Sequence, residues 1–156
     1  MHFILLFNMP LYSGLILTIL CFLHILHIIK EVVMEGDENN VRKYIKEIKI
    51  VIKEHGIFFV QKAQDEIIQL GINTTIAKEI ISKLEIKDYI KGPIDDDDKR
   101  FRQFKVWIFG IEPINGVLET YIKLSDRRDN QRVVCLSFHT AKSSMKHPFI
   151  KCDKIN

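Results

Sequence analysis

Cysteine is scarce in this sequence, with three residues among 156 and no Cys-x-x-Cys pair. An odd number of isolated cysteines indicates neither a disulfide framework nor a zinc knuckle, and it fits a reducing compartment. The sequence also lacks internal repeats, a glycine-rich phosphate loop, an H-E-x-x-H motif and a G-x-S-x-G motif. We therefore expect no resident metal and no cofactor.

Charge is absent from the first 29 residues, and Lys30 is the first charged side chain. The apolar run from Leu11 to Ile29 is long enough to cross a hydrocarbon core of roughly 30 Å. It is a poor signal peptide, because no basic region precedes it and no small-residue cleavage site follows. Residues 1–33 are therefore either a membrane anchor, with the following lysines and arginines holding the rest in the cytoplasm, or a mis-assigned start. The polar beginning at Met34 favours the second interpretation.

The remaining charge is unevenly distributed, although the net charge is only +3. Residues 1–98 hold 11 Lys/Arg against 15 Asp/Glu, whereas residues 99–156 hold 12 against 5. A basic C-terminal half fits a binder of phosphate backbones, and a solvated basic face stays open as the alternative. The run Asp95–Asp98 is predicted to be a solvated acidic turn rather than a cation site. Lys99, Arg100, Arg102 and Lys105 follow it as a cationic rim.

Helical periodicity marks residues 34–84. Apolar residues spaced by three and four predict a helix over Asn39–His55, ended by Gly56, with its inward stripe at Val41, Tyr44, Ile45, Ile48 and Ile52. Ile57–Val60 is predicted as a buried extended segment. A second helix is expected over Gln61–Leu70, with Ala63, Ile67 and Leu70 inward. A third, capped by Asn73 or Thr74, would turn Ile76, Ile80 and Leu84 inward. Gly92–Pro93 predicts a loop.

Alternation of period two predicts a three-stranded antiparallel meander after this loop. Its strands contain Trp107–Gly110, Tyr121–Leu124 and Leu136–His139, with turns at Asn115–Gly116 and Asp126–Gln131. Leu118, Thr120, Ile122 and Leu124 are expected on one face of the second strand. In the third strand, Val134, Leu136 and Phe138 are expected opposite Val133, Cys135, Ser137 and His139.

Tyr121, Lys123, Ser137 and His139 should therefore emerge on one face of the sheet. A phenol, an ammonium, a hydroxyl and an imidazole on one rigid surface suit a phosphate-handling site, although any half-exposed sheet carries such residues. Ser137 and His139 do not indicate a catalytic triad, because no acid is placed to orient the histidine. Trp107 and Phe109 are expected in the core, and Cys135 as a small apolar filler. In the tail, Met145, Pro148 and Phe149 should pack back.

The expected fold class is α+β, with N-terminal helices packed on a small antiparallel sheet. The expected organisation is an apolar segment, 1–33, followed by one domain, 34–156.

Four sequence blocks resemble the MqsR toxins, the mRNA interferases of type II toxin–antitoxin systems, which have a RelE-like fold. The blocks are Asp88-Tyr89-x-Lys91-Gly92-Pro93, Trp107-Ile108-Phe109-Gly110, Tyr121-Ile122-Lys123 and Ser137-Phe138-His139. The resemblance runs from about Val41 to Phe149 and leaves the apolar segment out.

The resemblance implies metal-independent cleavage of single-stranded mRNA in the cytoplasm, which inhibits translation and growth. It also implies a cognate antitoxin, encoded nearby, through which operator DNA is bound. The family's active-surface positions carry over to Lys91, Tyr121, Lys123 and His139. Two departures are Ile108, where some members have glutamine, and His139, where the family has lysine.

The residues themselves suit that chemistry. Metal-free RNA cleavage by the 2′-OH needs a base, cations for the phosphorane and an acid for the leaving oxygen. His139 is the best acid or base, with Lys91, Lys123 and Arg102 as cations and Tyr121 as a donor or stacking group. Arg102, Lys105 and Ser137 are the expected RNA-binding residues. A non-catalytic RNA- or antitoxin-binding relative and a membrane-tethered interaction protein stay open as alternatives.

Overall fold

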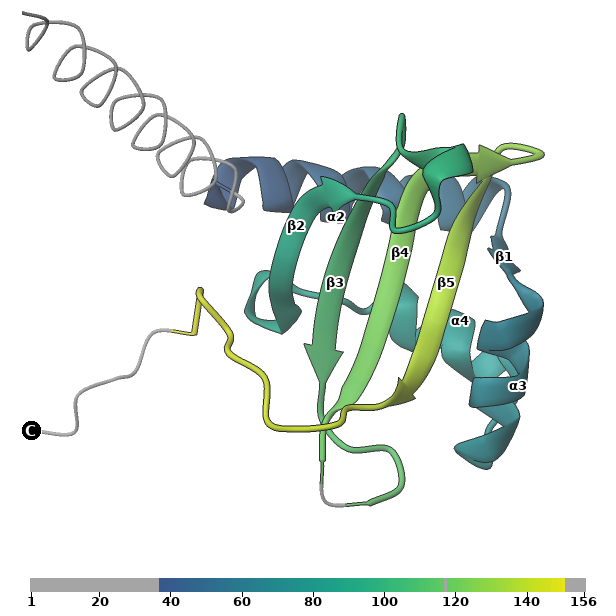
Figure 1. The fold of residues 1–156 in the computed structure, drawn as a ribbon, viewed down its shortest axis with the longest axis vertical. Helices are drawn as coiled ribbons and strands as arrows, with labels where there is room; N and C mark the ends of the chain where they lie inside the picture. Colours follow the sequence, from purple (N-terminus) through teal and green to yellow (C-terminus); the bar gives the residue numbers. More distant parts are fainter. Residues whose placement is uncertain (1–36, 117, 151–156) are drawn as a thin grey trace, which may run out of the picture. The chain divides into compact units, whose positions relative to one another are not determined.

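The computed structural model describes residues 37–116 and 118–150. They form an α+β fold of three helices and a five-stranded mixed sheet (Figure 1). The helices are α2 (Glu38–Glu54), α3 (Gln61–Gln69) and α4 (Thr74–Ser82), and the strands are β1 (Ile57–Phe59), β2 (Tyr89–Asp95), β3 (Lys105–Ile111), β4 (Thr120–Asp129) and β5 (Arg132–Thr140). Two 3₁₀ turns, η1 (Ile86–Asp88) and η2 (Lys99–Phe101), flank β2. The expected α+β class is confirmed.

The candidate anchor or mis-assigned start, residues 1–33, lies outside the described residues. Within residues 37–116 and 118–150, no helix has the length and apolar character needed to span a bilayer.

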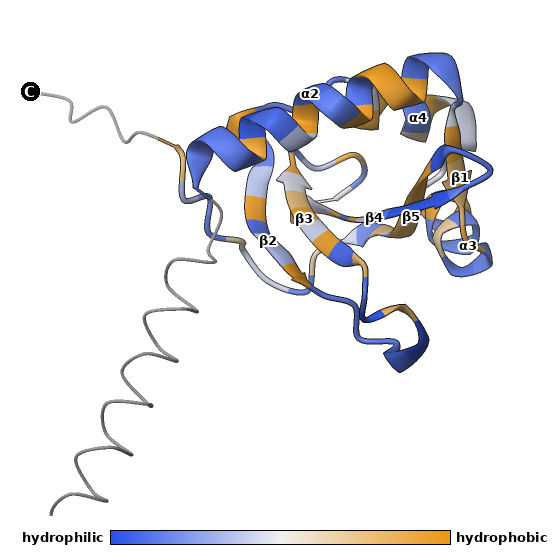
Figure 2. Ribbon diagram, turned by 90° about the horizontal axis from the view of Figure 1, so that it is seen from above, coloured by the Kyte–Doolittle hydropathy of each residue, from blue (hydrophilic) through white to orange (hydrophobic). Residues whose placement is uncertain are grey.

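Helix α2 begins at the cap Asp37, whose carboxylate accepts a hydrogen bond from the Asn39 amide at 3.5 Å. All five residues of its predicted inward stripe are buried. Figure 2 shows α2 lying along one face of the sheet, with apolar and polar residues alternating along the helix. Tyr44 stacks on Trp107 with ring centroids 4.2 Å apart, which joins the helix to the middle of β3. Trp107 and Phe109 are buried in the core, as predicted.

The Tyr44 hydroxyl is buried and has no hydrogen-bond partner among the described residues. We expect Tyr44→Phe to leave the free energy of unfolding unchanged or to raise it by about 1 kcal/mol, because an unsatisfied polar group leaves the interior. Tyr89→Phe is the matched control, because the Tyr89 hydroxyl donates to the Gly92 carbonyl, and it should cost about 1 kcal/mol. Urea unfolding measures both. A Tyr44→Phe variant that is the less stable of the two would contradict the assignment.

The two shorter helices complete the same core. Ala63, Ile67 and Leu70 are buried, as predicted for the second helix. For α4 and the residues after it the prediction is confirmed in part, because Leu84 is buried and Ile80 packs partly buried against the core. It is wrong for Ile76, which is 42% exposed, whereas the neighbouring Ala77 and Ile81 are fully buried. A helix this short accommodates two neighbouring apolar stripes.

The sheet differs from the predicted three-stranded meander at both edges. The strand order is β1-β5-β4-β3-β2, and β1 pairs with β5 in parallel through Phe58 and Val134. The sheet is therefore mixed rather than purely antiparallel. Residues around Gly92–Pro93 were predicted to be a loop, but they form the edge strand β2. An edge strand tolerates proline because one side of its backbone needs no partner.

Two features set the register of β4 and β5. The hairpin turn is only Asn130–Gln131, both with positive φ (47° and 68°), so β4 extends through most of the predicted turn. Leu118 is exposed and precedes the strand, contrary to prediction.

A bulge interrupts the pairing of β4 with β5. Lys123 pairs with Ser137, but Leu124 pairs with Cys135, which leaves Leu136 as the extra residue. Cys135 therefore faces the core, and its predicted placement beside Ser137 is wrong.

Gly92 lies close to the backbone of β3. Its φ is +132°, and an added Cβ would lie 2.7 Å from the Val106 carbonyl oxygen and 3.0 Å from Trp107 Cα. The Gly92–Pro93 peptide bond is cis. Only glycine can adopt this positive φ and also allow the β3 backbone to lie so close.

Candidate active site

The predicted polar residues lie on the face of the sheet opposite α2, which we call the open face. Residues directly paired across antiparallel strands share a face. One row of pairs joins Lys91, Ile108, Lys123 and Ser137 across four strands, and the next row joins Gly110, Tyr121 and His139. The sequence prediction that Tyr121, Lys123, Ser137 and His139 share one face is therefore confirmed, and Lys91 joins them from β2.

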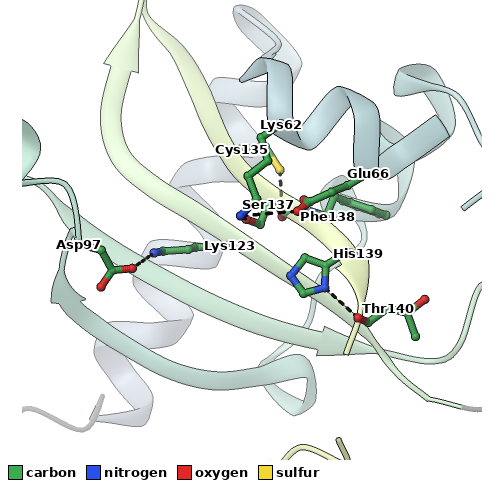
Figure 3. Close-up of polar contacts among 9 residues, drawn as sticks. All are labelled: Lys62, Glu66, Asp97, Lys123, Cys135, Ser137, Phe138, His139 and Thr140. Carbon is green, nitrogen blue, oxygen red and sulfur yellow. Dashed lines mark hydrogen bonds and ion pairs between the residues drawn. The ribbon is translucent and has the colours of Figure 1, made fainter. Parts of the chain in front are cut away.

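Tyr121 and His139 form a stacked pair at the centre of the open face, with ring centroids 4.9 Å apart and planes 16° from parallel. His139 Nδ1 lies 2.8 Å from the Thr140 carbonyl oxygen (Figure 3). A carbonyl can only accept, so Nδ1 carries a proton and Nε2 is the nitrogen left to act as a base. Burial, and then the charges of Asp97 and Glu66, raise the pKa of Tyr121. The phenol is therefore a hydrogen-bond donor at neutral pH.

Lys123 is the most enclosed cation of the open face, with 15% of its side chain exposed. Its Nζ donates to Asp97 Oδ2 at 2.6 Å (Figure 3). The hydrogen bond and charge of Lys123 lower the pKa of Asp97, whose side chain is 88% exposed. A solvent-exposed carboxylate therefore occupies the anion-binding position of an enclosed ammonium.

The acidic run is more ordered than the predicted solvated turn. Asp95 pairs with Lys105 at 2.5 Å, and Asp96 is buried and accepts from the Asp98 amide at 3.0 Å. Asp98 pairs with Arg100 at 2.7 Å, and hydrogen bonds from Arg100 lower the pKa of Asp98 to about 2. Each carboxylate has its own partner. No group of three potential metal-ligating side chains occurs in the described ranges, 37–116 and 118–150.

Two predicted RNA-binding residues lie apart from the two rows. Arg102 is exposed in the segment after η2, which stands in front of the upper end of the sheet in Figure 1. Lys105 and Trp107 are two positions apart in β3, so their side chains lie on the same face of the sheet. Ile108, which pairs with Lys123, lies on the other face. Lys105 is therefore engaged by Asp95 away from the open face, and Arg102 is an exposed cation outside both rows.

The tail after β5 borders the other end of the open face. Gly110 leaves room for it, because an added Cβ would lie 2.5 Å from Met145 Cε and 3.3 Å from His147 Cε1. Glu119 holds the tail by accepting from the Met145 amide at 2.9 Å and contacting His147 Nε2. Phe149 then packs against Tyr89, with ring centroids 5.3 Å apart. The predicted return of the tail is confirmed for Met145 and Phe149, whereas Pro148 is exposed.

Two residues of α3 were missed by sequence analysis. Lys62 Nζ lies 3.4 Å from Ser137 Oγ, and Glu66 accepts a hydrogen bond from the Phe138 amide at 2.7 Å (Figure 3). Nothing in the sequence around Lys62 and Glu66 indicates that they belong to the site, because their contacts with β5 form only in the folded protein. Cys135 is fully buried, and burial raises the pKa of its thiol. It is a core filler, as predicted, and not a nucleophile.

Comparison with known proteins adds no assignment. No protein-family model matches the chain, and no curated protein matches it.

Proposed function

We propose that this protein is a metal-independent endoribonuclease that cleaves single-stranded mRNA, the toxin of a type II toxin–antitoxin system. The observation that carries the proposal is the Tyr121–His139 pair beside Lys123 on one open face. The resemblance of four sequence blocks to the MqsR family supports it, and so does the α+β architecture, which suits a RelE-like fold.

His139 Nε2 is the base in this proposal. It takes the proton of the 2′-OH as the 2′-oxygen attacks the neighbouring phosphorus, and Lys123 and Lys91 stabilise the added charge on the phosphorane. The bond from phosphorus to the 5′-oxygen then breaks, and the leaving oxygen takes a proton from the Tyr121 phenol. The products are a 2′,3′-cyclic phosphate and a free 5′-hydroxyl. The His139 imidazolium then loses its proton to solvent and the Tyr121 phenolate takes one up, so atoms and charge balance over the cycle without a metal.

The test is incubation of the purified protein, freed of any antitoxin, with single-stranded RNA in excess EDTA. We expect cleavage that leaves 2′,3′-cyclic phosphate ends and is lost on replacing His139. Binding of RNA by folded protein without cleavage would favour the non-catalytic alternative. Cleavage that stops in EDTA would overturn the metal-free mechanism.

The partners follow from the proposed class. An antitoxin encoded by a neighbouring gene would bind the toxin in the cytoplasm, and operator DNA would be contacted through the antitoxin alone. Co-expression with the neighbouring gene should restore growth that the protein alone inhibits. Equal growth inhibition with and without that gene would contradict this partnership.

Asp97→Asn should increase RNA affinity and the cleavage rate about two- to fivefold at low salt. The Asp97 carboxylate occupies the anion position of Lys123 at 2.6 Å. Because Asp97 itself is 88% exposed, we take the contribution of a solvated pair, about 0.2–1 kcal/mol, as the free energy lost when RNA displaces this carboxylate. Asp98→Asn is the matched control, because it removes the same charge from the same segment but contacts Arg100. Equal gains in the two variants would show a general charge effect instead of competition at Lys123.

A further inference from the structure

We propose that Lys62 of α3 binds one phosphate group of the RNA together with Lys123, above the hydroxyl of Ser137. The inference rests on the proposed function, because it takes the open face as the RNA surface. It adds a substrate-binding residue that lies 75 positions from Ser137 in the sequence.

Ser137 adjoins both lysines: the Lys62 ammonium lies at its hydroxyl, and Lys123 is its partner across the strands, with an ammonium turned towards Asp97 in the free protein (Figure 3). Lys62 Nζ lies 3.4 Å from Ser137 Oγ, and Lys123 is the residue directly opposite Ser137 across β4 and β5. Directly opposite residues have Cβ atoms about 4.5–5.5 Å apart. Ser137 is only 5% exposed. It accepts from Lys62 and keeps its own proton for an incoming oxygen.

Glu66 explains why Lys62 lies at the open face. Its carboxylate accepts from the Phe138 amide at 2.7 Å, beyond the last residue of β5 that pairs with β1. This contact docks α3 on the edge of β5. Glu66 also lies 3.6 Å from Lys62 Nζ, one helical turn away. The Lys62 side chain is nevertheless 70% exposed, so its ammonium remains accessible to a ligand.

The chemistry of this group matches a phosphodiester. Two ammonium groups and one hydroxyl offer charge-assisted donors to the two non-bridging oxygens of a singly charged phosphate. In the free protein the carboxylates of Asp97 and Glu66 offset the two ammonium charges, one on each side. RNA replaces Asp97, the more exposed of the two, and leaves Glu66 as the support of Lys62.

The test measures binding of a short single-stranded RNA with 2′-O-methyl groups throughout, which cannot be cleaved, over a series of salt concentrations. Lys62→Ala should weaken binding about tenfold at low salt and reduce the salt slope by about 0.7, the loss of one phosphate contact on a single strand. Lys62→Arg should retain most of the affinity. Lys78→Ala, an exposed lysine on α4, is the matched control and should leave affinity and slope unchanged.

Two failures are distinguishable. If the unmodified protein does not bind this RNA, the proposed function falls and the role of Lys62 falls with it. If it binds, and folded Lys62→Ala and Lys62→Gln bind with the same affinity and slope, only the role of Lys62 is overturned. Thermal unfolding of each variant establishes that it is folded.

Discussion

Replacing His139 with alanine should lower the RNA-cleavage rate by about 10²–10⁴-fold, the usual contribution of a general acid or base. The reason is geometric. Nδ1 is committed to the Thr140 carbonyl and the ring is stacked on Tyr121, so Nε2 is presented in a fixed orientation. The measurement is single-turnover cleavage of RNA in EDTA.

The control for this effect is His55→Ala, because His55 caps α2 away from the open face. Affinity for the 2′-O-methyl RNA should change little in His139→Ala, which separates a role in proton transfer from a role in binding. A folded His139→Ala protein that cleaves at the original rate would remove His139 from the mechanism.

Gly92→Ala should lower the free energy of unfolding by about 3 kcal/mol, a loss large enough to be diagnostic. A side chain at φ +132° is strained, and its Cβ would lie 2.7 Å from the Val106 carbonyl oxygen. Because that atom is backbone, β2 must move away from β3. Lys91, which directly precedes Gly92, would then be displaced from its position opposite Ile108. The rate of RNA cleavage should therefore fall as well.

Gly116→Ala separates the two causes of that loss. Gly116 has φ +134°, but an added Cβ would have nothing within 4 Å. It should therefore show only the conformational cost, about 1 kcal/mol. Urea unfolding compares the two variants. Equal losses would show that contact with Val106 contributes nothing.

The parts of the fold that follow a local rule were predictable. The stripe of α2 and the alternation of Tyr121 and Lys123 in β4 depend only on the geometry of one element, and both were correct. The sequence prediction placed Tyr121, Lys123, Ser137 and His139 on one face, because directly paired residues of antiparallel strands point to the same side of the sheet. The sequence therefore predicted the centre of the candidate site.

The parts that depend on distant contacts were missed. The bulge at Leu136 places Ser137 and Cys135 on opposite faces of the sheet, and the residues around it do not indicate a bulge. The pairing of Phe58 with Val134 joins segments far apart in the sequence. Asp97 was read as one of four solvated carboxylates, because only the fold brings it to Lys123. Lys62 reaches Ser137 for the same reason.

The position of β5 in the sheet has a consequence for synthesis. Its neighbours on both sides, β4 and β1, precede it in the chain, and it is the last strand of the described residues. During translation the helices and β4 leave the ribosome first, and neither the parallel edge nor the Tyr121–His139 pair exists until β5 has emerged. A nascent chain that stops before β5 therefore carries Lys91 and Lys123 without His139. The open face therefore becomes complete only after β5 has paired with β4.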